Sequence, residues 1–169
     1  MKAMAGTRAR GFTLIELMVT IVVLVVLITV AVPSFDNIRL SSRLTSYATD
    51  LVSGSQLART EAIKRNAVVR LCVSSDGTSC ATTGQWETGW IVISADGTVI
   101  QKQPAAAGGF QIRDSGSLSA LLYDPTGVGA SAANFTICRA TPVGSQERVV
   151  KVSATGRSSV TRTSTGVCA

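Results

Sequence analysis

The sequence contains no histidine, and aromatic residues make up only 5% of its 169 residues. Without imidazole groups, histidine-based acid–base catalysis and histidine-ligated metal sites are excluded. The sequence also lacks a Walker A loop, a G-x-S-x-G nucleophile elbow, an H-E-x-x-H motif and a dinucleotide-binding fingerprint. We therefore expect no enzymatic activity, no cofactor and no bound metal.

The four cysteines include no C-x-x-C pair, which argues against zinc and thioredoxin-like sites. An even number of cysteines favours disulfide bonds in an oxidising compartment over free buried thiols. Sequence alone leaves three pairings open for four cysteines. We favour a bond between Cys72 and Cys80, closing a short hairpin around the S-S-D-G-T-S stretch. A second bond between Cys138 and Cys168 would then hold the C-terminus to a strand.

Residues 12–35 form an apolar run in which Glu16 is the single charged residue, and a short basic stretch precedes it. A helix from Phe12 to Val32 would be about 32 Å long, enough to cross a bilayer core of about 30 Å. The basic residues would keep the preceding end in the cytoplasm. A simple membrane anchor is one interpretation. However, a carboxylate in an apolar helix costs free energy unless it has a partner, so Glu16 indicates a further function.

The string GFTLIE at residues 11–16 resembles the class III signal of type IV pilins and type II secretion pseudopilins. The resemblance implies that residues 1–11 are a leader, which a prepilin peptidase removes by cutting between Gly11 and Phe12. The same enzyme would then methylate Phe12. Glu16 would pair with the new amino terminus of a neighbouring subunit, which offsets part of its desolvation cost and fixes the axial register of a filament. Pro33 matches a family proline at which the helix kinks or loosens.

Beyond Pro33, apolar residues recur at helical spacing between polar ones and predict one buried face. We expect a second helical stretch from about Asp36 to Arg65, packed on a sheet. The residues of this apolar stripe are Leu40, Leu44, Tyr47, Leu51, Ala58 and Ala62. The chain then divides into a leader (1–11), a hydrophobic transmembrane and assembly helix (12–33), an amphipathic helix that continues into the head (34–66) and a β-rich globular head (67–169).

After Asn66 the apolar residues alternate with a period of two, which predicts strands. Asp-Gly pairs at 76–77 and 96–97 predict hairpin turns, and turn chemistry explains Asp76, Asp96 and Asp124 better than acid–base roles. The fold class is therefore α+β, with a long N-terminal helix packed on an antiparallel sheet or on two small sheets, and the resemblance implies that this fold is pilin-like. The predicted strands are 67–74, 89–94, 98–102, 110–114, 120–124, 134–139 and 148–153.

The head resembles the GspH/FimT family, a branch of the pilin superfamily that contains FimT/FimU-like minor pilins and the H-type minor pseudopilin. The matching stretches are WETGWIVISADG (86–97), YDPTGVG (123–129) with NFTIC following, and VSATGR (152–157). Within the first stretch we interpret Trp86 and Trp90 as core packing rather than a ligand platform.

The resemblance implies a minor pilin of a type IV pilus that helps to prime pilus assembly, sits at or near the tip and serves twitching motility. It would be a single-pass protein of the bacterial inner membrane with a periplasmic head. Its partners would be other minor pilins, the major pilin, the prepilin peptidase and the inner-membrane assembly platform. An alternative is an H-type minor pseudopilin of type II secretion, whose partners would be other pseudopilins.

The C-terminal part of the head is basic, with Arg148, Lys151, Arg157 and Arg162 as candidate DNA or anion contacts. If these cations share a face, they would bind DNA in a salt-sensitive way that is blind to sequence. The resemblance implies DNA uptake through a Gly-Arg-x-Arg motif in some relatives, but Ser159 stands here in place of the second arginine. The alternative is a set of solvated charges on edge strands.

Overall fold

The computed structural model describes residues 11–129, 132–165 and 168. Residues 1–10, which hold most of the predicted leader, lie outside the described residues, as does the side chain of Pro33. The chain divides into two units, with the boundary between Ile38 and Arg39. We describe each unit by itself.

Helix α1 (Leu14–Arg65) contains both predicted helical segments and continues through Pro33. It begins after Thr13, whose Oγ1 accepts the backbone N–H of Glu16 at 3.3 Å. This contact is an N-cap, and a threonine followed three residues later by glutamate is the sequence signature of a capping box. Within the part of the chain that the structure describes, no helix is both long enough and apolar enough to cross a membrane.

The C-terminal part of α1, from Arg39 onward, packs on the head through the predicted apolar stripe. Five residues of the stripe are at most 1% exposed, and Tyr47 packs against the same core. Gly54 lies on this face because the Trp90 ring comes so close that a Cβ at residue 54 would lie 2.5 Å from it. The prediction of a buried helix face is confirmed, and the five buried residues are Leu40, Leu44, Leu51, Ala58 and Ala62.

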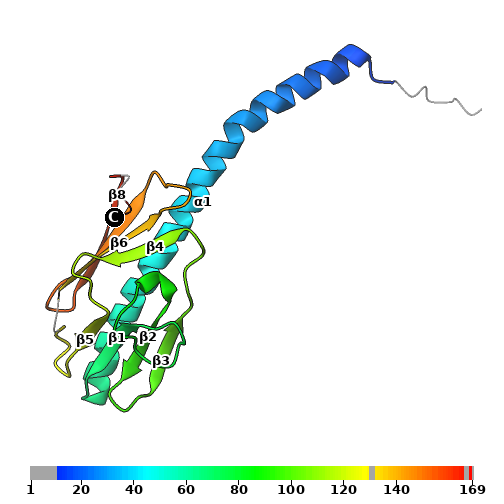
Figure 1. The fold of residues 1–169 in the computed structure, drawn as a ribbon. Coiled ribbons are helices and arrows are strands. Elements are labelled where there is room, and N and C mark those ends of the chain that lie inside the picture. Colours follow the sequence, from blue (N-terminus) through cyan, green and yellow to red (C-terminus); the bar gives the residue numbers. More distant parts are fainter. Residues whose placement is uncertain (1–10, 130–131, 166–167, 169) are drawn as a thin grey trace, which may run out of the picture. The chain divides into compact units, whose positions relative to one another are not determined.

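Two four-stranded antiparallel sheets make up the rest of the head, which confirms the α+β prediction (Figure 1). Sheet A has the order β3-β2-β1-β5 and consists of β1 (Val69–Val73), β2 (Trp90–Ser94), β3 (Val99–Gln103) and β5 (Ala120–Tyr123). Sheet B has the order β4-β6-β7-β8 and consists of β4 (Phe110–Asp114), β6 (Ala133–Arg139), β7 (Glu147–Val152) and β8 (Ser158–Thr163). A short 3-10 turn, η1 (Trp86–Thr88), precedes β2.

The seven predicted strands correspond to β1 through β7, with ends that differ by no more than two residues. The sequence missed β8, which has a single apolar residue, Val160. This strand lies at the edge of sheet B, and most of its residues are exposed. Because neither face of β8 is fully buried, its sequence shows no alternation of apolar and polar residues.

Of the two Asp-Gly pairs, only 96–97 joins two paired strands. Gly97 has φ +85° in the turn between β2 and β3. The pair 76–77 lies instead in the loop between β1 and η1, so its assignment to a strand hairpin was wrong. Asp76 Oδ1 accepts the N–H groups of Thr78 at 2.8 Å and Ser79 at 3.0 Å, which holds that loop without strand pairing. These bonds hold the pKa of Asp76 well below its usual range.

Both disulfide bonds are formed with the pairing that we favoured, Cys72–Cys80 and Cys138–Cys168. The core interpretation of the tryptophans is also confirmed, since Trp86 and Trp90 are each 2% exposed. Trp86 packs edge-on against Phe135, with ring centroids 4.9 Å apart. The indole therefore joins the η1 segment to sheet B.

Candidate functional site

The N-terminal part of α1 exposes apolar side chains on every side. The large apolar residues from Leu14 to Ile28 are between 49% and 77% exposed, and Phe12 is 83% exposed. A helix that is apolar all round is normally buried by its surroundings, and apolar patches of this size mark interaction or membrane surfaces. This surface is the first candidate site.

Gly11 precedes this surface, and nothing in its structure calls for glycine. A Cβ added at Gly11 would meet no atom within 4 Å, and Gly11 is not among the glycines with positive φ. Glu16 is exposed and forms no ion pair within the described residues. Within the described residues, packing and ion pairing therefore give no reason for the type of these two residues.

The second candidate site is the predicted group of four cations. One of them, Arg148, is buried and bonded within the chain. This residue is 6% exposed, and its Nη2 and Nε donate to Ser41 Oγ at 2.9 Å and Thr45 Oγ1 at 3.3 Å on α1. Its Nη1 donates to the backbone oxygen of Glu147 at 2.9 Å. Burial lowers the pKa of Arg148, and neighbouring Arg162 lowers it further. Arg148 fastens sheet B to the helix and is not available to a polyanion.

The strand register separates the other cations as well. Arg148 pairs with Arg162 and Lys151 pairs with Ser159 across β7 and β8. Because successive side chains of a strand point to opposite faces, Arg162 shares the face of Arg148, and Lys151 lies on the other face. The condition for a shared cationic face is therefore not met by all four residues. Lys151 and Arg157 line a pocket of about 480 Å³ that also includes Asn134 and Ser159.

Two of the glycine-containing stretches meet in space and have a packing role. A Cβ at Gly156 would lie 3.1 Å from the backbone oxygen of Gly127 and 3.3 Å from the ring of Tyr123. Tyr123 Oη shares a 2.5 Å hydrogen bond with Ser55 Oγ, which also contacts Ser158 Oγ at 3.0 Å. Burial raises the pKa of Tyr123. These contacts join α1 to both sheets.

Ser55 was missed by sequence reasoning, although a polar residue within an apolar helix face is a readable signal. It lies four residues after Leu51 and is fully buried. A buried hydroxyl requires a hydrogen-bond partner. In a helix that packs on sheets, this requirement predicts a polar residue on the facing strands.

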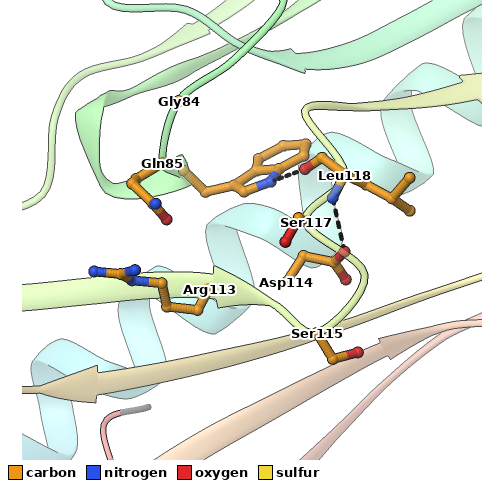
Figure 2. A pocket seen from close by; sticks show the side chains of 8 residues that line it. Gly84, Gln85, Arg113, Asp114, Ser115, Ser117 and Leu118 are labelled. Atoms are coloured by element: carbon orange, nitrogen blue, oxygen red, sulfur yellow. Dashed lines mark hydrogen bonds between the residues drawn. The ribbon is translucent and has the colours of Figure 1, made fainter.

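A third candidate site is a pocket of about 340 Å³ between η1 and the loop that joins β4 to β5 (Figure 2). Trp86 Nε1 donates to the backbone oxygen of Leu118 at 2.7 Å and so fixes one wall against another. No sequence motif indicates this pocket, because its residues come from two separate stretches, 84–86 and 113–118. The lining residues are Gly84, Gln85, Trp86, Arg113, Asp114, Ser115, Ser117 and Leu118.

Comparison with protein families gives two matches on this chain. The family described as Type II transport protein GspH matches residues 47–156, more than half of the chain, and the Prokaryotic N-terminal methylation motif matches residues 6–32. The chain belongs to the GspH family. A comparison with curated protein sequences gives no significant match.

Solved structures share the fold of this GspH-family chain. The type IV minor pilin FimU of Pseudomonas aeruginosa PAO1 aligns with a TM-score of 0.57 and 21% identity, covering 72% of this chain and 90% of FimU. The minor pseudopilin EpsH of the type 2 secretion system of Vibrio cholerae aligns with a TM-score of 0.53 and 13% identity, covering 70% of this chain and 96% of EpsH. At the level that these matches support, the chain is a minor pilin or pseudopilin of the type IV pilus or type II secretion kind.

The two family matches cover different candidate sites. The methylation motif covers the exposed apolar helix with Gly11, Phe12 and Glu16. The GspH match covers the head, including both pockets in large part. The first site therefore coincides with the methylation motif, while the two head pockets need separate explanations.

Proposed function

We propose that this chain is a minor pilin of a type IV pilus. A prepilin peptidase cuts it between Gly11 and Phe12 and methylates Phe12, and residues 12–33 hold it in the bacterial inner membrane with the head in the periplasm. The observation that carries the proposal is the helix surface from Leu14 to Ile28, which is apolar on all sides, exposed, and interrupted by one acid at Glu16.

Glu16 fixes the axial register in which this surface packs against neighbouring helices. In a bundle of parallel helices the carboxylate leaves water, which is costly unless an opposite charge meets it. Cleavage creates an α-amino cation at Phe12 on each subunit, and a neighbour's cation can meet Glu16 at one axial position only. The ion pair therefore selects one register among the many that apolar contacts alone would permit.

The partners in this role are other minor pilins, the major pilin and the inner-membrane assembly platform. The chain helps to start the filament and stays at or near its tip, in support of twitching motility. The similarity of the head to FimU, which is described as a type IV minor pilin, supports this choice.

Mass spectrometry of the mature protein tests the proposal. We expect a chain that begins with N-methylated Phe12, isolated from a membrane fraction that resists extraction with alkaline carbonate. An intact Met1 would contradict processing and leave a simple membrane anchor as the interpretation. Release of the full-length protein by carbonate would contradict membrane insertion. Loss of twitching in a deletion strain, restored by the parent gene, then assigns the pilus.

An H-type minor pseudopilin of type II secretion is the second candidate, favoured by the family description and by the likeness to EpsH. Both candidates have the same N-terminal chemistry, so N-terminal processing does not distinguish a pilin from a pseudopilin. The phenotype of a deletion strain distinguishes them. If secretion of exoproteins fails while twitching continues, the chain is a pseudopilin.

DNA uptake in natural transformation is a third candidate, favoured by the pocket that brings Lys151 and Arg157 together. Phosphate contacts would make the affinity for duplex DNA fall steeply with salt. Arg157→Ala should then weaken binding, while Arg162→Ala, on the opposite face of β8 from the pocket residue Ser159, serves as the matched control. Equal affinities in the two variants would exclude the pocket as the DNA site.

A further inference from the structure

The pocket between η1 and the β4–β5 loop contains a guanidinium whose hydrogen-bonding capacity is unused. Arg113 Nε has no exposed surface and no hydrogen-bond partner within the described residues. The nearest carboxylate oxygen, Glu87 Oε1, is 3.9 Å from Nε, which is too far for a hydrogen bond. Nε itself is too buried to be reached, but Nη1 and Nη2 donate no hydrogen bond within the described residues. Because the Arg113 side chain is 37% exposed, these two groups are the donors available to a ligand.

Glu87 does not accept a hydrogen bond from Arg113, because another contact holds its carboxylate. Glu87 Oε2 accepts the backbone N–H of Ile112 at 3.1 Å. This bond ties η1 to strand β4 and keeps the carboxylate at the edge of hydrogen-bonding reach. The pair retains a weak attraction, as expected for a partly exposed ion pair.

The opposite walls carry neutral polar groups. Figure 2 shows Gln85 across the pocket from Arg113, and Ser117 in the β4–β5 loop next to Asp114. Neither side chain forms a hydrogen bond within the described residues. Ser117 has φ +55°, a conformation that non-glycine residues rarely adopt, and this backbone presents its hydroxyl to the pocket.

The acid in the wall is already satisfied by the backbone. Asp114 Oδ2 accepts the N–H groups of Gly116 at 2.9 Å and Leu118 at 3.0 Å, and Oδ1 accepts that of Asn134 at 3.0 Å. These three bonds hold the loop in place and occupy both carboxylate oxygens. Arg113 is the one cation among the residues that line the pocket.

We propose that this pocket binds a hydroxylated carboxylate of monosaccharide size, a sugar acid. A guanidinium and a carboxylate form paired, charge-assisted hydrogen bonds, which makes a carboxylate the matching anion. Gln85 and Ser117 then bind the ligand hydroxyl groups. A volume of about 340 Å³ lies at the small end of ligand pockets and suits a single sugar ring. This binding function is independent of the assembly role proposed above.

The two tryptophans of the chain provide a direct test. The indole N–H of Trp86 donates to Leu118 in the pocket wall, whereas Trp90 packs against Gly54 of α1 and does not line the pocket. We would titrate the ¹⁵N-labelled full-length chain in detergent micelles with glucuronate. The Trp86 indole resonance should shift in a saturable way while that of Trp90 stays in place.

Three variants assign the binding to named groups. Arg113→Gln should weaken glucuronate binding at least about tenfold, the loss expected for one charged hydrogen bond. Arg70→Gln, an exposed arginine on sheet A, is the matched control and should bind as the parent does. Glu87→Gln keeps an acceptor for Ile112 but removes the competing charge, so it should tighten binding by about two- to fivefold.

Two related probes test the ligand class. Glucose lacks the carboxylate and acetate lacks the hydroxyl groups, so each should bind at least about tenfold more weakly than glucuronate. An unmoved Trp86 resonance, or equal affinity in Arg113→Gln with Trp90 in its parent position, would overturn the site. Acetate binding as tightly as glucuronate would overturn the sugar-acid assignment.

Discussion

The two parts of helix α1 use apolar residues in opposite ways. Before the unit boundary, from Leu14 to Ile28, the large apolar side chains surround the helix and are all at least 49% exposed. After the boundary, apolar residues form one stripe, and residues such as Leu44 are fully buried within the chain's own head. The two parts of the helix differ in the polar residues that lie between their apolar residues. A stripe bounded by polar residues finds its partner in the same chain, while an apolar surface on all sides requires partners from outside.

The largest effect expected from this contrast concerns assembly. Glu16→Gln removes the charge that would pair with a neighbour's amino terminus and leaves that cation buried without a partner. Such a loss corresponds to at least about a hundredfold fall in incorporation. Immunoblots of sheared filaments against whole cells measure it, and urea unfolding of the head should not change.

A matched variant separates the register role of Glu16 from its place in the capping box. Thr13→Ala removes the hydroxyl that caps the Glu16 N–H, at a cost of about 1 kcal/mol in helix stability. It keeps the acid, so filaments should still contain the variant. If Thr13→Ala is lost from filaments as completely as Glu16→Gln, capping rather than charge pairing explains Glu16.

The next effect concerns the stability of the head. Leu44→Ala should lower its free energy of unfolding by about 2–5 kcal/mol, because it opens a cavity at a fully buried position. Leu24→Ala, at a residue that is 55% exposed, should change it by less than about 0.5 kcal/mol. Tryptophan fluorescence during urea unfolding in detergent reports both. Similar losses in the two variants would mean that the N-terminal helix surface is also part of the folded core.

The disulfide bonds should differ in the same measurement, since the chain segments that they close differ in length. The bonded cysteines are 30 residues apart in Cys138–Cys168 and 8 apart in Cys72–Cys80. Loop-closure entropy gives losses of about 3.6 and about 2.5 kcal/mol for the Cys138→Ser and Cys72→Ser variants. A larger loss in Cys72→Ser would show that burial of Cys72 in strand β1 outweighs the entropy difference.

The sequence predicted most of the fold because most of its elements have a buried face. The stripe from Leu40 to Ala62 and the alternating strands follow from periodicity. The favoured cysteine pairing is confirmed, although sequence alone left three pairings open. Strand β8 escaped because an exposed edge strand carries no such pattern. The loop at Asp76 was misassigned because side-chain acceptors can replace strand pairing after an Asp-Gly pair.

The candidate sites were less predictable, because they depend on register and on distant residues. Arg148 and Lys151 are three residues apart in β7 and therefore lie on opposite faces. The predicted strand 148–153 already contained this information, but a count of nearby cations did not use it. The pocket with Arg113 and Gln85 joins stretches from different elements, and only the folded chain brings them together.

The smallest expected effect is a pH dependence in the turn between β2 and β3. Hydrogen bonds from Ser94 Oγ and from the Thr98 N–H lower the pKa of Asp96 to about 2. Since the folded pKa lies below the ordinary value of about 3.9, the charged form stabilises the folded state above pH 4. This contribution is lost as the pH falls through about 2.

Asp96→Asn should therefore lower the unfolding free energy at pH 7, and its difference from the parent should shrink between about pH 4 and pH 2. Urea unfolding of both proteins across this range measures the difference, and the acid response of other carboxylates cancels because both proteins share it. Ser94→Ala removes the hydrogen bond that contributes most to the lowered pKa of Asp96, so it should raise the pKa of Asp96 in the folded state. The stabilisation by charged Asp96 should then be lost at a higher pH than in the parent. A difference that is constant from pH 7 to pH 2 would mean that Asp96 acts through the shape of the turn, since the shape is the same in both charge states.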